Sequence, residues 1–227
     1  MLLNGLGRAL EAPDPVAAPR IARIEALRRE LLADPTELEV VDYGAGRAGS
    51  GPAPTIRRPV AVACRASKSP FWCRILFEMM RAMAPCRAVE LGTCVGISAS
   101  YQATAQELAG GGHLWTLEGA PALAALARRN LEGLGLSSVT VVEGPFADTL
   151  EGVLDVAAPV DWAFIDGHHE ERATLTYFRA FLPHLAERAV LLFDDIAWRP
   201  ACVGPGRPSG GTSASPCRST SGRWVSV

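Results

Sequence analysis

This sequence carries little net charge, and it lacks the cysteine patterns, long apolar runs and basic clusters that mark several classes of protein. Its 22 lysine and arginine residues stand against 24 acids, and a net charge of −2 gives no basic surface for nucleic acid or an anionic membrane. The six cysteines form no CxxC pair and no metal-ligand spacing, which favours free thiols in a reducing compartment. No apolar run is long enough for a transmembrane helix, and Met1 to Pro13 lacks the regions of a signal peptide. We therefore expect a cytoplasmic protein without nucleic-acid or membrane partners.

The segment before the patterned part of the chain predicts two helices and a flap. A first helix is expected from Arg20 to Ala33, where Asp34-Pro35 ends it because the residue before proline leaves the helical region. A second helix is expected to begin after Ser69, with Pro70 at its first position. Its buried face is predicted to hold Phe71, Ile75, Leu76, Met79, Met80 and Met83.

Between these helices, the segment Val40 to Gly46 resembles a nucleotide-binding turn. The next residues, Arg47 to Pro54, are too rich in Gly and Pro to open a helix, so no helix N–H groups would face a ligand. We interpret the segment as a flexible flap over a site formed elsewhere.

From Cys86 onward, short apolar strands alternate with helices. Strands are predicted over Ala88–Leu91, Leu114–Leu117, Val139–Val142, Trp162–Ile165 and Val190–Phe193. Helices are predicted over Ile97–Ala109, Ala120–Gly133, Phe146–Leu154 and Glu170–Ala186. This alternation indicates a parallel sheet covered on both faces, which right-handed crossovers wind into a doubly wound, Rossmann-like α/β fold.

The pattern stops abruptly after the fifth strand. Residues 199–227 are mostly Gly, Pro, Ser and Arg, without an acid or an apolar period, and predict a disordered, low-complexity tail. We therefore divide the chain into a leader, helix and flap over 1–68, a Rossmann-like domain over 69–198, and the tail. The sheet is expected to be truncated after its fifth strand.

Acidic residues close four of the five predicted strands. Glu90, Glu118 and Asp166 end the first, second and fourth strands, and Asp194 and Asp195 end the fifth. The carboxyl ends of parallel strands share one edge of the sheet, so these acids are expected to converge on one crevice. Glycines in the turn after the first strand let backbone approach a ligand closely, and the next helix offers unpaired N–H groups.

Three motifs resemble those of class I S-adenosylmethionine-dependent methyltransferases, over about residues 86–198. Glu90-Leu91-Gly92-Thr93-Cys94-Val95-Gly96-Ile97-Ser98 is similar to the first motif of the catechol and caffeoyl-CoA O-methyltransferase branch and its bacterial relatives. Asp161 to His169 resembles the fourth-strand motif of that branch, and Leu191 to Ile196 resembles its fifth strand.

The resemblance implies a cofactor site along the first three strands. The turn with Glu90, Gly92, Thr93, Gly96 and Ser98 would hold the amino-acid end of S-adenosylmethionine, and Asp166 would also border the cofactor. Glu118 would bind the ribose, as its position about twenty residues past the turn also suggests. Gly144 and Phe146 would border the adenine, although Pro145 stands where the family commonly has an acid.

The resemblance also implies a metal and a base. In metal-dependent members, acids in the positions of Asp166, Asp194 and Asp195 bind a divalent ion, and three oxygen ligands suit Mg²⁺. His169 falls where the branch often places a residue that accepts the substrate's proton, and we take His169 and Asp166 as the candidate catalytic residues. The alternatives are that Asp194 and Asp195 only end a strand, that the histidines only occupy a turn, and that Glu90 is structural.

The sequence thus predicts a methyltransferase that acts on the oxygen of a small molecule, with S-adenosylmethionine and Mg²⁺ as candidate cofactors and a homodimer as one candidate assembly. A cofactor-binding protein without turnover is the alternative, because the predicted sheet lacks the strands that usually follow the fifth. An NAD-dependent oxidoreductase is disfavoured, since the GxGxxG motif is absent.

Overall fold

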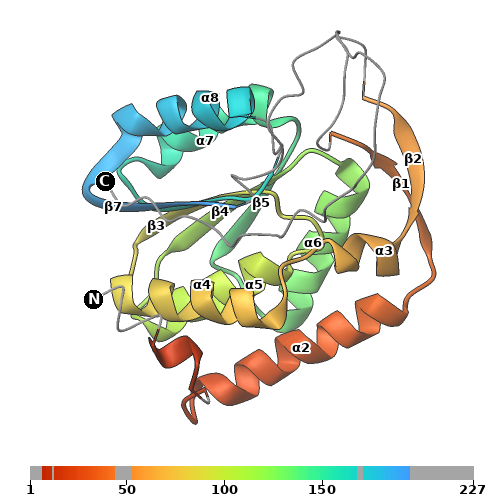
Figure 1. Ribbon diagram of the computed structural model, residues 1–227, viewed down its shortest axis with the longest axis horizontal. Helices are drawn as coiled ribbons and strands as arrows, with labels where there is room; N and C mark the ends of the chain where they lie inside the picture. Colours follow the sequence, from red (N-terminus) through yellow and green to blue (C-terminus); the bar gives the residue numbers. More distant parts are fainter. Residues whose placement is uncertain (1–6, 12, 44–52, 168–170, 195–227) are drawn as a thin grey trace, which may run out of the picture.

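The computed structural model describes residues 7–11, 13–43, 53–167 and 171–194 (Figure 1). Within them, five parallel strands form one sheet in the order β5-β4-β3-β6-β7. The strands span β3 (Arg87–Leu91), β4 (His113–Glu118), β5 (Val139–Glu143), β6 (Val160–Ile165) and β7 (Leu185–Phe193). The chain runs outward from β3 to one edge and then returns past it to the other edge. This confirms the doubly wound, Rossmann-like α/β fold, and each of the five predicted strands is present, with β7 longer than predicted.

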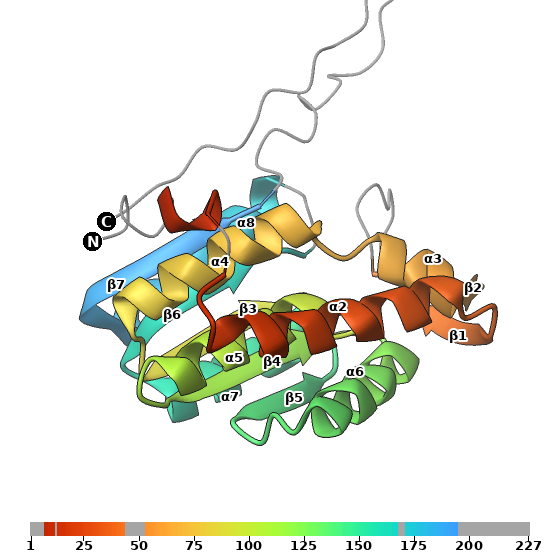
Figure 2. The ribbon, with the colours of Figure 1, turned by 90° about the horizontal axis from the view of Figure 1, so that it is seen from below.

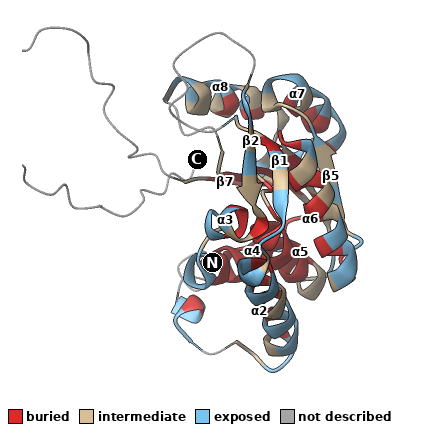
Figure 3. Ribbon diagram, turned by 90° about the vertical axis from the view of Figure 1, so that its right-hand side faces the viewer, coloured by how far each residue is buried: buried red, intermediate tan, exposed pale blue. Residues whose placement is uncertain are grey.

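Helices cover both faces of the sheet, so its central strands are buried on two sides (Figures 1 and 3). One face is packed by α4 (Pro70–Met83), α5 (Ile97–Leu108) and α6 (Pro121–Leu134), with Phe77, Tyr101 and Trp162 buried in that layer. The other face is packed by α7 (Phe146–Ala157) and α8 (Glu171–Phe181), around Phe181 and Leu154. Two separate apolar layers explain why the central strands read as nearly continuous apolar runs.

The helix α4 begins as predicted. The Ser69 hydroxyl accepts a hydrogen bond from Trp72 N at 3.4 Å, and Pro70 occupies the first turn, where its missing N–H has no intrahelical partner to lose. The predicted burial of Phe71 is wrong: its side chain is 49% exposed. Phe71 lies in the first turn, before the stripe that faces the core is established.

The segment before α4 is more ordered than the sequence suggested. The helix α2 (Ala17–Ala33) starts three residues before the predicted Arg20, because Asp14 Oδ1 accepts hydrogen bonds from Val16 N and Ala17 N at its start. It packs along α5 and α6 (Figure 2). Two elements were not predicted: an antiparallel hairpin of β1 (Glu37–Val41) and β2 (Thr55–Pro59), and the short helix α3 (Val60–Arg65). Most of the predicted flap, residues 44–52, lies outside the described part of the chain.

The last predicted helix is too long. Helix α8 ends at Phe181, a 3-10 turn follows over Leu182–His184, and β7 begins at Leu185 rather than Val190. Pro183 explains the difference, since it cannot donate the backbone hydrogen bond that a continuing helix needs. The register between β6 and β7 shifts between Val160 and Trp162, which accommodates the longer strand.

No helix in the described ranges is both long and apolar enough to cross a membrane. The predicted tail, residues 199–227, falls outside those ranges, so the expected end of the sheet after β7 stays a prediction.

Candidate functional site

A cavity of about 650 Å³ lies at the carboxyl ends of the central strands, within the size range of small-molecule sites. Its walls come from the hairpin, the segment before α4, the turns after β3, β4 and β6, and the start of α7. Six of the predicted site residues line it: Gly92, Thr93, Ser98, Glu118, Phe146 and Asp166. Of the acids that the sequence placed on one rim, Glu118 and Asp166 line this cavity.

The turn between β3 and α5 is held tightly between two neighbouring strands. Gly92 N donates to Leu117 O at 3.0 Å, and Asp166 N donates to Leu91 O at 2.9 Å. Gly92 has a φ of +105°, and a Cβ at this position would lie 2.3 Å from Asp166 O. Only glycine fits this backbone, which brings β3 against the end of β6.

Glu118 lines the cavity and at the same time fixes the turn. Its two carboxylate oxygens accept backbone hydrogen bonds, one from Cys94 N at 2.8 Å and one from Ala120 N at 2.9 Å. Burial raises the pKa of Glu118, although these amides favour its charged form. A carboxylate held by backbone amides at the mouth of β4 can also accept hydrogen bonds from hydroxyl groups of a ligand.

Glu90 is fully buried and does not line the cavity. It accepts hydrogen bonds from Gln102 Nε2 at 2.7 Å and from Thr116 Oγ1 at 2.6 Å. Burial raises the pKa of Glu90 to about 7, against the hydrogen bonds that favour the carboxylate. The Thr116 hydroxyl is also 2.6 Å from that of Thr93, which does line the cavity. Glu90 is thus connected to the cavity wall through the hydroxyl groups of Thr116 and Thr93.

The loop after β5 contributes an aromatic wall. Phe146 packs edge-to-face against Tyr177 at a centroid distance of 5.8 Å, and both rings line the cavity. Gly144, with a φ of +134°, and Pro145 lead the chain into α7 at this point, and Pro145 also lines the cavity. Gly144 and Gly96 shape turns beside the cavity and are not among the residues that line it.

The opposite side of the cavity contains a residue that the sequence interpretation missed. Lys68 Nζ lies 3.1 Å from Asp166 Oδ1 and also forms an ion pair with Asp194. Burial disfavours the charge on Lys68, but Asp166 and Asp194 outweigh it and raise the pKa of the ammonium. Burial also raises the pKa of Asp166 well above its usual value, against the effect of the ammonium.

The sequence did hold one signal for Lys68: it is the single lysine in a chain that otherwise uses arginine. Two other predicted residues, His169 and Asp195, lie outside the described residues. Within the described ranges, no group of three or more His, Cys, Asp or Glu side chains is gathered as a metal site would require.

Comparison with known proteins agrees with this geometry. A family model for the methyltransferase domain matches residues 89–196. The O-methyltransferase TomG from Streptomyces achromogenes, solved with S-adenosylmethionine, is 26% identical, with a TM-score of 0.53 over 59% of each chain. The Podospora anserina methyltransferase PaMTH1, solved with S-adenosylhomocysteine, is 22% identical, with a TM-score of 0.53 over 58% of this chain and 55% of that one.

A third similar structure is the O-methyltransferase from Bacillus cereus in complex with S-adenosylhomocysteine. It is 18% identical, with a TM-score of 0.56 over 85% of this chain and 74% of that one. No protein of curated function matches the sequence significantly. The chain spans only 55% and 59% of the Podospora and Streptomyces proteins. The sheet order, the first motif at the turn after β3 and the domain matched over residues 89–196 together support a class I S-adenosylmethionine-dependent methyltransferase domain.

Proposed function

We propose that this protein transfers a methyl group from S-adenosylmethionine to a hydroxyl oxygen of a small molecule. The observation that supports this most directly is one cavity with two different ends. The Gly92 turn and Glu118 form one end, and Asp166 with Lys68 forms the other. A cofactor bound at the first end would direct its reactive group toward the second.

The cofactor end fits S-adenosylmethionine in its chemistry. Gly92 and Thr93 allow close backbone approach, and Glu118 offers carboxylate oxygens for the two ribose hydroxyls. Phe146 and Pro145 would contact the adenine, and Ser98 at the start of α5 would contact the amino-acid end. Glu90 would act from behind, by orienting Thr93 through Thr116.

The acceptor end supplies a base. S-adenosylmethionine carries its methyl on a sulfonium, so the acceptor oxygen bonds to that carbon as the carbon–sulfur bond breaks, and the acceptor's proton must leave. The carboxylate of Asp166 lines the cavity and would take that proton, while the cavity positions the two reactants. His169 stays a second candidate for this role from the sequence.

The predicted metal site does not fit a metal as the side chains lie. Asp166 and Asp194 do come together, but the ammonium of Lys68 is bonded to both. A divalent ion would need the same carboxylate oxygens and would be repelled by the ammonium. We therefore propose a transfer that does not use the Mg²⁺ expected from the sequence.

Calorimetry with S-adenosylhomocysteine tests the cofactor half. The wild-type chain is expected to bind it, and Glu118→Ala is expected to weaken binding by about 100-fold, the loss of two hydrogen bonds to a charged group. Glu143→Ala is the matched control: Glu143 is the register partner of Glu118 on β5, where it pairs with Arg128. Binding by Glu143→Ala should stay within about threefold of wild type.

Absence of binding by the wild-type chain, or equal binding by Glu118→Ala, would contradict the proposal. A parallel titration with NAD tests the disfavoured oxidoreductase. Methylation of any hydroxylated acceptor in a panel would rule out the alternative of a cofactor-binding protein without turnover. The cytoplasmic location and the homodimer expected from the sequence stay predictions.

A further inference from the structure

Lys68 is the only lysine in the chain, and the structure places it between the two acids that end β6 and β7. Its side chain is 17% exposed, and those of Asp166 and Asp194 are 12% and 30% exposed. An isolated ammonium so far from water would be unfavourable, whereas one bonded to two carboxylates is not. The three residues therefore form one ion-paired group at the cavity.

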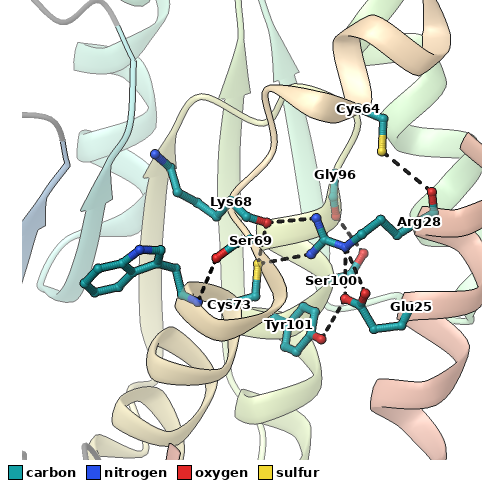
Figure 4. Close-up of polar contacts among 10 residues, drawn as sticks. Glu25, Arg28, Cys64, Lys68, Ser69, Cys73, Gly96, Ser100 and Tyr101 are labelled. Carbon is teal, nitrogen blue, oxygen red and sulfur yellow. Dashed lines mark hydrogen bonds and ion pairs between the residues drawn. The ribbon is translucent and has the colours of Figure 1, made fainter. Parts of the chain in front are cut away.

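The backbone carbonyl of Lys68 accepts hydrogen bonds from two side chains (Figure 4). Arg28 of α2 donates from Nη1 to Lys68 O at 2.8 Å, and Cys73 Sγ donates to the same oxygen at 3.4 Å. Arg28 is itself held by Glu25 at 3.0 Å, and the Tyr101 hydroxyl donates to Glu25 at 2.8 Å. Figure 4 shows the Lys68 side chain extending away from this cluster. The backbone of Lys68 is thus held in place by α2 and α4, and its ammonium by Asp166 and Asp194.

A cation at the acids of the fourth and fifth strands is what the metal-dependent relatives would obtain from a divalent ion. We propose that in this chain the ammonium of Lys68 takes the place of that ion, so that the acceptor end works with a cation built into the fold. This inference rests on the proposed function only for its role in methylation. The exclusion of a metal follows from the contacts alone, because ion and ammonium need the same oxygens and carry like charge.

An ammonium in place of a divalent metal ion changes which acceptor molecules the site can hold. An ammonium has three N–H donors, and within the described residues two of them are used by Asp166 and Asp194. One donor is left for the cavity, so Lys68 can hold a single acceptor oxygen. A metal with open positions can coordinate two neighbouring hydroxyls. The acceptor class that follows is a molecule with one anchoring hydroxyl, for which a vicinal diol brings no advantage.

The single lysine makes a direct test simple. In the full-length chain grown with ¹³Cε-lysine, the one lysine signal in the NMR spectrum reports on Lys68. Because Mn²⁺ broadens the signals of nuclei near it, an ion bound to Asp166 and Asp194 would erase this signal. We expect the signal to persist at one equivalent of Mn²⁺ in the wild type. Its loss in the wild type, but not in the double variant Asp166→Asn with Asp194→Asn, would overturn the proposal.

The variant Lys68→Met gives the reciprocal test by electron paramagnetic resonance of free Mn²⁺. With the ammonium gone, two carboxylates face each other without a cation, and we expect Mn²⁺ affinity to rise by roughly tenfold or more over the wild type. The added substitution Asp194→Asn should remove that gain. Equal Mn²⁺ binding by Lys68→Met and the wild type would overturn the proposal, since the acids would then not be a cation site at all.

The Mn²⁺ experiments test the role of Lys68 independently of the proposed function. If the wild-type chain fails to bind S-adenosylhomocysteine, the proposed function fails, and the Mn²⁺ measurements still decide what Lys68 does. If it binds the cofactor product and methylates an acceptor, excess chelator should leave the rate unchanged. A monohydroxyl acceptor should then be methylated within about threefold of the matching vicinal diol, whereas a preference for the diol of about tenfold or more would overturn the acceptor class.

Discussion

The two halves of the sheet's carboxyl edge hold their acids in different ways. On β3 and β4, Glu90 and Glu118 receive hydrogen bonds from uncharged groups: an amide side chain, a hydroxyl and two backbone N–H groups. Across β6 and β7, Asp166 and Asp194 share one ammonium. The same type of side chain at the same edge therefore has a different electrostatic environment on each side.

This difference separates the tasks of the two halves. Neutral donors leave the negative charge of Glu118 available to hydroxyls of a ligand, and burial keeps the pKa of both glutamates raised. The ammonium instead forms ion pairs with two carboxylates and adds a hydrogen-bond donor of its own. The first half is suited to recognise an uncharged, hydroxyl-bearing group, and the second is suited to hold and deprotonate an acceptor.

Substituting the residue at which the two halves touch should have the largest effect. In Gly92→Ala, the new Cβ would lie 2.3 Å from Asp166 O at a φ of +105°, so either the turn or the end of β6 must move. We expect a loss of roughly 3 to 5 kcal/mol in the free energy of unfolding, from backbone strain and overpacking together. Denaturant titration measures it, and a loss below about 1 kcal/mol would show that the halves are not in tight contact.

The second prediction concerns the buried acid of the first half. Because the pKa of Glu90 is raised from 4.5 to about 7, the folded chain keeps a proton there that the unfolded chain releases. The stability contributed by Glu90 is full below pH 4.5 and is lost as the pH rises through about 7. Gln does not titrate, so the stability of Glu90→Gln relative to wild type should rise by on the order of 3 kcal/mol across this window.

Denaturant titrations of both proteins on either side of the window measure this difference. If the stability difference between Glu90→Gln and wild type does not change with pH, the pKa of Glu90 is not raised, and the half of the edge on β3 and β4 is not desolvated as described.

The third prediction compares one acid from each half. Glu118→Gln places an NH₂ group against one of the two backbone donors, from Cys94 or Ala120, and should weaken binding of S-adenosylhomocysteine by about tenfold. Asp194→Asn, which changes only a partner of Lys68, should leave that affinity within about threefold. Isothermal calorimetry measures both. Equal losses would mean that the cofactor spans the two halves.

The smallest effect is expected far from both halves. Gly133 lies within α6, and a Cβ there would meet no atom within 4 Å. Gly133→Ala should therefore raise the free energy of unfolding by about 0.5 to 1 kcal/mol, because alanine loses less backbone entropy in a helix. Denaturant titration of Gly133→Ala in parallel with Gly92→Ala tests whether the loss of stability in Gly92→Ala comes from the tight contact at Gly92. Destabilisation by Gly133→Ala would mean that a glycine-to-alanine change lowers stability in this chain without such a contact.

Most of the fold could be predicted from local sequence patterns. Short apolar strands and capped helices can be predicted from local sequence. The strand β5 begins at Val139 as expected, and α4 begins at Pro70 because Ser69 and Pro70 mark its start. The hairpin of β1 and β2 was missed because its strands are short and a Gly- and Pro-rich segment separates them along the chain. The early end of α8 was missed although Pro183 marks it.

The site was predictable as far as strand ends determine it. The rim holding Glu118 and Asp166 follows from parallel topology, since every strand that ends in an acid brings it to the same edge. Lys68 was not predictable in this way, because it precedes a helix, and only tertiary packing of α2 against α4 and α5 brings it to the acids. Whether Glu90 faces ligand or protein also depends on side-chain directions that spacing does not contain.

A chain with a single lysine has one further property. Reagents that acylate or alkylate amines find, apart from the α-amino group, only Lys68 on the cavity wall. Coupling through amines to a dye, a resin or a sensor surface would therefore attach at the α-amino group or modify the site itself. Immobilisation through an affinity tag avoids this. Conversely, protection of Lys68 from an amine reagent by an added small molecule would identify a ligand without any measurement of turnover.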